Sequence, residues 1–173
     1  LICLSPVLIV VTIWLHFANK GAGAFFLQER PGLHGKVFKI IKYKTMTDER
    51  GADGELLPDA ERLTRVGRFV RSTSIDELPQ LINVLKGDMS FVGYRPERKY
   101  FIDQIMQHDV RYASLYQMRP GITSDATIYN GYTDTMEKML ERLSMDLHYL
   151  KTASLKGDVI IILKTLGLVA KGN

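Results

Sequence analysis

Two adjacent carboxylates, Asp76 and Glu77, form the part of this sequence best suited to chemistry, because arginines flank them on both sides. Arg71 precedes the pair and Arg95 follows it. Carboxylates can attack electrophiles or bind divalent metal ions, and arginine forks hold phosphate oxygens. The combination indicates phosphoryl-type chemistry. Taken alone, the two carboxylates also fit a solvated helix start with an ordinary surface ion pair.

The residues around Asp76 allow two helix starts. Ser74 and Glu77 have the spacing of a capping box, whereas Pro79 favours a start nearer Asp76, since proline prefers the first helical turn. Either start places Asp76 at a helix N-terminus, where the helix dipole stabilises an ionised carboxylate. We therefore expect Asp76 to be charged and nucleophilic. Adjacent side chains on a helix point about 100° apart, so Asp76 and Glu77 suit different roles, such as nucleophile and metal ligand or base.

Helical spacing also predicts a helix just before this pair. Its apolar side contains Leu63, Val66, Phe69 and Val70. Two arginines, at 68 and 71, fall on the opposite side. This helix would present cationic side chains beside the carboxylates.

The sequence resembles the bacterial sugar transferase family, the monotopic phosphoglycosyl transferases. The resemblance covers most of the chain and is carried by residues 28–32, 38–46, 63–65, 74–80, 85–90, 92–93 and 119–123. One departure is Tyr94, because the family commonly has Gly-Pro-Arg-Pro where this chain has Gly-Tyr-Arg-Pro at 93–96. The arginine of that motif is retained as Arg95.

The resemblance implies a transferase that moves a phosphosugar from a UDP-sugar to a membrane polyprenol (undecaprenyl) phosphate, releasing UMP. It implies that Asp76 is the nucleophile and forms a covalent phosphosugar intermediate, in the initiating step of bacterial glycoconjugate assembly. Mg²⁺ would be held by Asp76, Glu77 or both, because one or two carboxylates plus substrate phosphates suit this ion. Arg71, Arg95 and Lys42 would hold phosphate oxygens, and the family pattern places Lys42 near the active site.

Arg119 is a weaker candidate for substrate binding. It lies just before residues 122–132, which resemble a family segment near the nucleotide pocket. Its alternative role is to cap the end of the preceding helix, since arginine can bind the last carbonyl groups of a helix. The sequence leaves both roles open.

The N-terminal segment, residues 1–17, is apolar and uncharged, and its length is close to the lower limit for crossing a bilayer. It could be a spanning helix, a signal-peptide core, or a helix that enters the membrane and returns. Ser5 and Pro6 favour the last, because proline breaks a helix and a serine hydroxyl can bind the carbonyl that is released. The resemblance implies the same re-entrant helix, with the active site on the cytoplasmic face of the bacterial inner membrane. We therefore expect a membrane helix at 1–19 and a catalytic domain at 20–173.

Length and composition favour one domain with a real core. The 173 residues carry a net charge of +4, which suits an anionic partner such as a nucleotide or membrane lipids, but the basic residues lack the aromatic interleaving of nucleic-acid binders. A single cysteine, Cys3, excludes an internal disulfide. The pattern predicts an α+β, mainly helical fold with a small sheet from strands at 25–27 and 37–43, where Lys42 and Lys44 share one strand face.

The remaining segments have simpler interpretations. Residues 48–61 read as a surface loop, 97–118 as one helix, 122–132 as a loop with a short strand, and 135–150 as a helix whose methionines face the core. The apolar segment 155–169 fits either a membrane interface, with its lysines reaching headgroups, or burial in the domain. A metal-dependent phosphohydrolase and a non-catalytic lipid-binding module are the rival functions. The sequence does not indicate which sugar is transferred or the oligomeric state.

Overall fold

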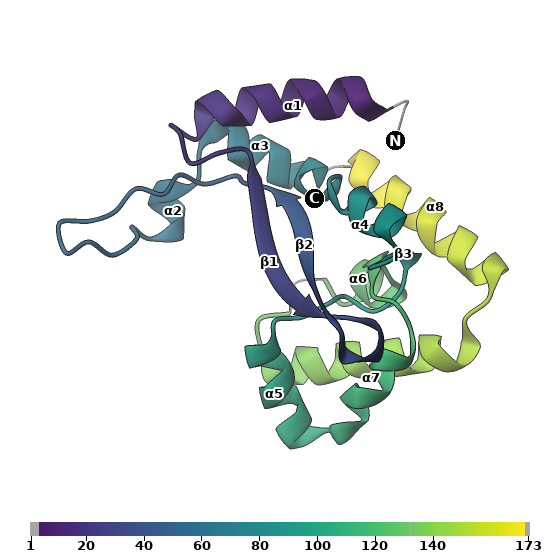
Figure 1. The fold of residues 1–173 in the computed structure, drawn as a ribbon. Coiled ribbons are helices and arrows are strands. Elements are labelled where there is room, and N and C mark those ends of the chain that lie inside the picture. The colour runs from purple at the N-terminus through teal and green to yellow at the C-terminus, as the bar shows by residue number, and fades with distance from the viewer. Residues whose placement is uncertain (1–3, 132, 172–173) are drawn as a thin grey trace. The chain divides into compact units, whose positions relative to one another are not determined.

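The structure, a computed structural model, describes residues 4–131 and 133–171 (Figure 1). It confirms the predicted α+β, mainly helical fold with small sheets. The elements are α1 (Ser5–Ala18), β1 (Phe25–Pro31), η2 (Leu33–Gly35), β2 (Val37–Tyr43), α2 (Asp59–Arg62), α3 (Arg65–Ser72), η3 (Ile75–Glu77), α4 (Gln80–Lys86), β3 (Ser90–Val92), α5 (Lys99–His108), η4 (Val110–Gln117), β4 (Gly121–Thr123), α6 (Asp125–Tyr129), α7 (Met136–Thr152) and α8 (Leu155–Lys171).

The chain forms two compact units. Among described residues, the first unit contains 4–27 and 41–82, and the second contains 28–40 and 83–171. The sheet of β1 and β2 and the helix α4 contribute residues to both.

In the first unit, α1 lies alongside α3 (Figure 1). Val11 and Leu15 of α1 are buried with Tyr43 and Val70 in one apolar cluster, against which Val66 also packs. The inward position predicted for Val66 and Val70 is confirmed, but Phe69, predicted on the same side of α3, is 51% exposed. The side chain of Thr64 caps α3 by accepting a hydrogen bond from the amide of Gly67 at 2.8 Å.

Gly67 allows α3 to pack closely against the segment that follows β2. A Cβ atom at this position would lie 1.9 Å from the carbonyl oxygen of Thr45. No side chain larger than hydrogen fits at that distance without a backbone shift. This segment carries Thr45 and directly follows the end of β2 that carries Lys42, so the close contact helps to position the candidate site.

Ser5 and Pro6 form the first turn of α1, where a missing proline N–H costs no hydrogen bond. The helix then continues without interruption to Ala18. The other side of the predicted break, residues 1–3, lies outside the described residues, so the break stays a prediction. None of the helices within 4–131 and 133–171 has the length and apolar character needed to cross a membrane.

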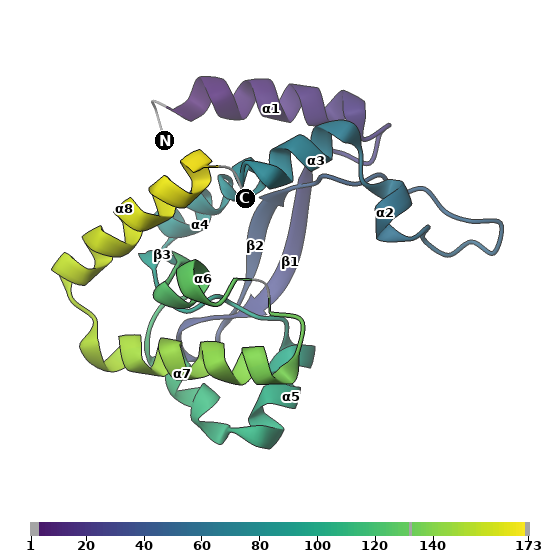
Figure 2. The same ribbon diagram turned by 180° about the vertical axis from the view of Figure 1, so that it is seen from behind.

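In the second unit, β3 and β4 pair in parallel, with Ser90 opposite Gly121 and Val92 opposite Thr123. Helices α5 and α7 pack with η4 around a core that includes Tyr94 and Tyr112 (Figure 2). Met136 and Met139 of α7 pack against this core, as predicted.

The single helix predicted at 97–118 is wrong. Helix α5 ends at His108, Asp109 is extended at φ −148°, and a 3₁₀ segment, η4, begins at Val110. The Asp109 carboxylate accepts a hydrogen bond from the amide of Arg111 at 2.9 Å, so a local side-chain cap replaces the continuing helix. Helix α6 was also missed, because the segment 122–132 was interpreted as loop and strand; its cap is Ser124, which accepts from the amide of Thr127 at 3.0 Å.

Helix α8 is partly buried in the second unit, and its other predicted role, at a membrane interface, stays a prediction. Ile161 is buried with Val92 and Tyr149, so one side of the helix packs in the second unit. On another side, Leu155 and Leu163 are 84% and 63% exposed. Part of the predicted apolar surface therefore remains exposed in the structure.

Candidate active site

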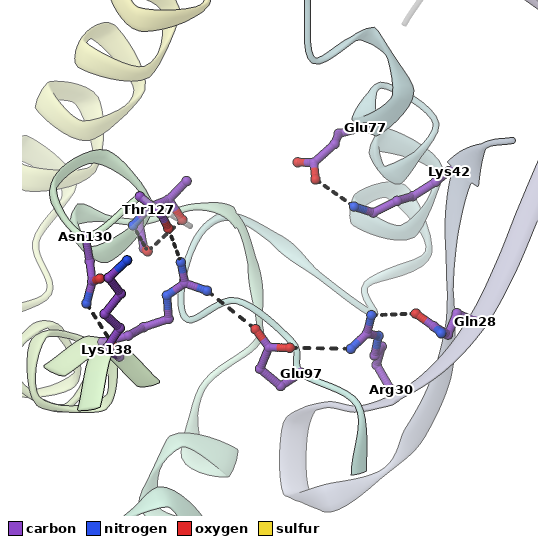
Figure 3. A network of polar contacts seen from close by, with 11 residues as sticks. Gln28, Arg30, Lys42, Glu77, Glu97, Thr127, Asn130 and Lys138 are labelled. Atoms are coloured by element: carbon purple, nitrogen blue, oxygen red, sulfur yellow. Dashed lines mark hydrogen bonds and ion pairs between the residues drawn. The ribbon is translucent and has the colours of Figure 1, made fainter. Parts of the chain in front are cut away.

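Lys42, Arg71, Asp76 and Glu77 come together in the first unit. The Lys42 ammonium lies 2.7 Å from Oε1 of Glu77 (Figure 3). The two side chains are only 18% and 22% exposed, so this ion pair is shielded from solvent more than most surface pairs. Strand β2 supplies the lysine and η3 supplies the carboxylate.

Lys44, predicted on the same strand face as Lys42, has different partners. Its ammonium forms an ion pair with Asp48 and donates to the carbonyl of Ala22. Of these two lysines, Lys42 is the one paired with the carboxylate at 77.

The turn that carries Asp76 differs from the predicted capping box. Ser74 adopts a left-handed conformation, with φ 54° and ψ 16°, and its side chain makes no capping hydrogen bond. Asp76 is the middle residue of the three-residue η3 segment, and the next α-helix begins at Gln80, directly after Pro79. The left-handed serine turns the chain out of α3, so Asp76 is not in the first turn of an α-helix.

The surroundings raise the pKa of Asp76 to about 6. Burial is the largest cause and the charge of Glu77 is the next, while Lys42 and Arg71 act in the opposite direction. The expectation that the helix dipole keeps this carboxylate strongly ionised is therefore wrong, since desolvation outweighs the nearby positive charges. Asp76 is nevertheless mostly ionised at neutral pH, and its raised pKa makes it more basic than an exposed aspartate.

Arg71 is fixed on the side of this turn. Its Nε donates a hydrogen bond to Oγ1 of Thr45 at 2.8 Å, and Thr45 is buried. The positive charge acts on Asp76, lowering the pKa of that carboxyl. The hydrogen bond to Thr45 uses one of the five guanidinium N–H groups of Arg71. It holds the planar guanidinium group in place near the Asp76 carboxylate.

Comparison with known proteins identifies the family. The bacterial sugar transferase family matches residues 1–172. The chain belongs to this family. The predicted resemblance and the predicted enzyme class, a sugar transferase, are thereby confirmed.

Three relatives illustrate the similarity to bacterial sugar transferases. The uncharacterized sugar transferase EpsL of Bacillus subtilis (strain 168) is 43% identical over 99% of this chain and 83% of the relative. The UDP-glucose:undecaprenyl-phosphate glucose-1-phosphate transferase of Caulobacter vibrioides is 42% identical over 94% of this chain and 62% of the relative. The UDP-N-acetylgalactosamine-undecaprenyl-phosphate N-acetylgalactosaminephosphotransferase of Aeromonas hydrophila is 35% identical over 97% of this chain and 40% of the relative. The chain thus spans less than two thirds of the length of the latter two.

Arg95 and Arg119 belong to the second unit. The charge of Arg95 lowers the pKa of both Arg30 and Arg142, which places it among buried arginines. Arg119 donates from Nε to the carbonyl of Gly87 at 2.9 Å and lines a cleft of about 800 Å³. It therefore binds the chain just after α4, and the alternative that it caps the preceding helical segment is wrong.

The second unit contains a polar network that the sequence did not reveal. Glu97 joins Arg142, 3.4 Å away, to Arg30, 3.6 Å away, and Arg30 also donates to Gln28 (Figure 3). Asp146 is buried nearby, and burial raises its pKa to about 7. Arg30 lies in a segment that carried the family resemblance, but the two α7 residues had no signal beyond their place in a helix.

Asp76 and Glu77 are the side chains of this site that would hold a Mg²⁺ ion. No cluster of three or more metal-ligating side chains occurs among residues 4–131 and 133–171. The charge of Glu77 raises the pKa of Asp76, so a cation shared by the two would relieve their repulsion. One or two carboxylates with phosphate oxygens and water are the usual Mg²⁺ ligands, and this site offers two.

Proposed function

We propose that this protein transfers a phosphosugar from a UDP-sugar to a polyprenol phosphate in the membrane. The main support is a half-buried Asp76 with a raised pKa, beside Arg71 and the Lys42–Glu77 ion pair, in a bacterial sugar transferase. Relatives named for UDP-sugars and undecaprenyl phosphate support both substrates. The reaction would initiate assembly of a bacterial glycoconjugate.

The chemistry proceeds in two displacements. A carboxylate oxygen of Asp76 attacks the sugar-bearing phosphorus of the UDP-sugar, and the bond between that phosphorus and the UMP oxygen breaks. UMP leaves, and Asp76 carries the phosphosugar. A phosphate oxygen of the polyprenol phosphate then attacks the same phosphorus, which releases the Asp76 carboxylate and forms the polyprenyl diphosphate sugar.

Charged side chains near Asp76 suit the anionic substrates. Arg71 is held by Thr45 and can bind phosphate oxygens as charge shifts from one oxygen to another. Lys42 holds Glu77 in place and keeps a positive charge near the nucleophile. When bound to Asp76 and Glu77, Mg²⁺ would neutralise diphosphate charge. As the sequence predicts, we also assign Arg95 and the more exposed Arg119 to substrate binding.

The membrane location rests on α1. Its large apolar side chains include Ile9, Val10, Ile13 and Phe17, which are between 54% and 75% exposed. Such a surface is costly in water and suits the interior of a bilayer. We propose that α1 forms one arm of a re-entrant helix broken at Ser5 and Pro6, in the bacterial inner membrane with the active site on the cytoplasmic face.

A coupled assay tests this function. A panel of UDP-sugars is incubated with the protein, Mg²⁺ and undecaprenyl phosphate, and both UMP and lipid-linked sugar are measured. We expect equal amounts of the two products from at least one donor, and neither product from Asp76→Asn. Release of free sugar phosphate without lipid-linked product would instead show a phosphohydrolase. Full activity in Asp76→Asn would exclude the proposed nucleophile.

A further inference from the structure

An apolar groove runs along α1 in the first unit. It consists of two adjoining hollows of about 230 Å³ and 470 Å³, and both are lined by Thr12, Ile13 and Phe25. Because they share these walls, the two hollows form one continuous feature, which we call the α1 groove. Tyr43 and Pro79 line one end of it, and Phe17 lines the other.

The groove is long, apolar and open. Between Leu8 and Phe17, α1 advances by about 13 Å at the usual rise per residue. Ile13 and Phe25 are 54% and 47% exposed although they are large and apolar, so the groove lacks a covering partner in the described chain.

The hydroxyl groups within the groove are paired with each other and with the backbone. Oγ1 of Thr12 donates to the carbonyl of Leu8 at 2.6 Å and lies 3.0 Å from the hydroxyl of Tyr43. That tyrosine hydroxyl also lies 2.7 Å from the Leu8 carbonyl, as a donor. These contacts satisfy the two hydroxyl groups internally, and His16, near the Phe17 end, is the other polar side chain of the lining. A ligand would therefore meet a lining that is mainly suited to hydrocarbon.

One end of the groove is built from the same segments as the candidate active site. Tyr43 directly follows Lys42, and Pro79 comes two residues after Glu77. Ile75, the residue before Asp76, packs against the cluster that contains Tyr43. The nucleophile, its cationic neighbours and the apolar groove therefore belong to one structural unit.

We propose that the α1 groove binds the phosphate-proximal part of the polyprenyl chain of the lipid acceptor. The phosphate end would lie toward Tyr43 and Pro79, near the cationic side chains, and the chain would run along α1 toward Phe17. A phosphate joined to a long hydrocarbon is the ligand that complements a cationic site and an apolar groove built on neighbouring segments of one unit. This inference rests on the proposed function and adds to it the site that recognises the lipid.

The test separates the two half-reactions. Ile13→Trp places a larger side chain at the junction of the hollows, and Val10→Trp is the matched control, because Val10 is 62% exposed on α1 but lines neither hollow. Donor cleavage is measured as phosphosugar bound to protein without lipid. Acceptor use is measured as kcat/KM for polyprenyl phosphates of increasing length, from one isoprene unit to undecaprenyl phosphate, in one detergent.

We expect wild-type kcat/KM to rise with chain length over the first few isoprene units. In Ile13→Trp, kcat/KM should stop rising at a shorter chain length than in the wild type. The kcat/KM for undecaprenyl phosphate should fall at least about tenfold, because losing about 55 Å² of apolar contact has an effect of that size. Donor cleavage and use of the one-unit acceptor should stay within about twofold of wild type, and Val10→Trp should match wild type throughout.

Other results would overturn the inference. An unchanged chain-length profile in Ile13→Trp, or an equal loss in Val10→Trp, would show that the groove does not recognise the acceptor chain and only contacts bulk lipid. If the Ile13 variant unfolds by circular dichroism, Ile9→Trp, at another wall of the groove, replaces it. Failure of the proposed function is recognised separately, because wild-type protein would then cleave no donor.

Discussion

The charges around Asp76 predict that substitutions of Lys42 and of Glu77 shift the pKa of Asp76 in opposite directions. Lys42 lowers the pKa of Asp76 and Glu77 raises it, while burial sets the overall value of about 6. Lys42→Met removes a positive charge and should raise the pKa of Asp76. Glu77→Gln removes a negative charge and should lower it.

The expected shifts are roughly one pKa unit each, as is usual for a charged neighbour in a partly buried site. The Asp76 pKa should therefore move to about 7 in Lys42→Met and to about 5 in Glu77→Gln. At pH 6.5, the ionised fraction should fall from about three quarters in the wild type to about one quarter in Lys42→Met. Fewer molecules would then carry a nucleophilic carboxylate.

Carboxyl ¹³C NMR of metal-free protein, labelled at aspartate and titrated from pH 4 to 9, measures these values directly. Asp76→Asn assigns the resonance, because only one signal disappears. A wild-type Asp76 that titrates near 4, or shifts of the same sign in the two variants, would refute the electrostatic description of the site.

Three further predictions concern stability and the arginine anchor. Gly67→Ala should destabilise the fold by about 3 kcal/mol or more in thermal unfolding, because its Cβ would lie 1.9 Å from the Thr45 carbonyl oxygen, whereas Gly167→Ala, with nothing within 4 Å, should be neutral or stabilising. From about pH 4 to 7, Asp146 binds more protons in the native protein than in the unfolded chain, so its contribution to the free energy of unfolding should fall as pH rises, by at most about 4 kcal/mol. Denaturant unfolding of Asp146→Asn should lack this pH dependence. Arg71→Lys, which cannot keep the Nε contact with Thr45, should lower kcat of donor cleavage by about tenfold or more.

Each of these has its own contradicting result. Equal melting temperatures for the two glycine variants would show that α3 tolerates a wider spacing from the Thr45 segment. A pH slope of stability that persists in Asp146→Asn would assign it to another group. Unchanged donor cleavage in Arg71→Lys would remove the guanidinium fork from the mechanism.

Local patterns in the sequence predicted the elements whose causes are local. The helix now labelled α3 has apolar residues at helical spacing and a threonine cap, so its position and inward face could be predicted. The turn at Ser74 could not, because a left-handed conformation is uncommon for a residue other than glycine and depends on the packing around it. The break at Asp109 has a local cause, an aspartate cap, that the apolar periodicity on both sides concealed.

The electrostatics of the site depended on tertiary contacts. Lys42 and Glu77 are 35 residues apart in sequence, and only the family resemblance suggested that they would meet. Helix-dipole reasoning gave the wrong sign for the pKa of Asp76, since burial is set by segments distant in sequence. The buried pair on α7, Arg142 and Asp146, had no sequence signal because helical polar residues are usually solvated.

The most direct test of the central claim is to locate the phosphosugar on the protein. Protein, Mg²⁺ and UDP-sugar are mixed without lipid, quenched rapidly and analysed by peptide mass spectrometry. We expect one phosphosugar per chain, attached to the carboxyl of Asp76, with an equal amount of UMP released and loss of the label when polyprenol phosphate is added. An enzyme that makes lipid-linked sugar while Asp76 stays unmodified at every quench time, or that carries the label on another residue, would contradict it.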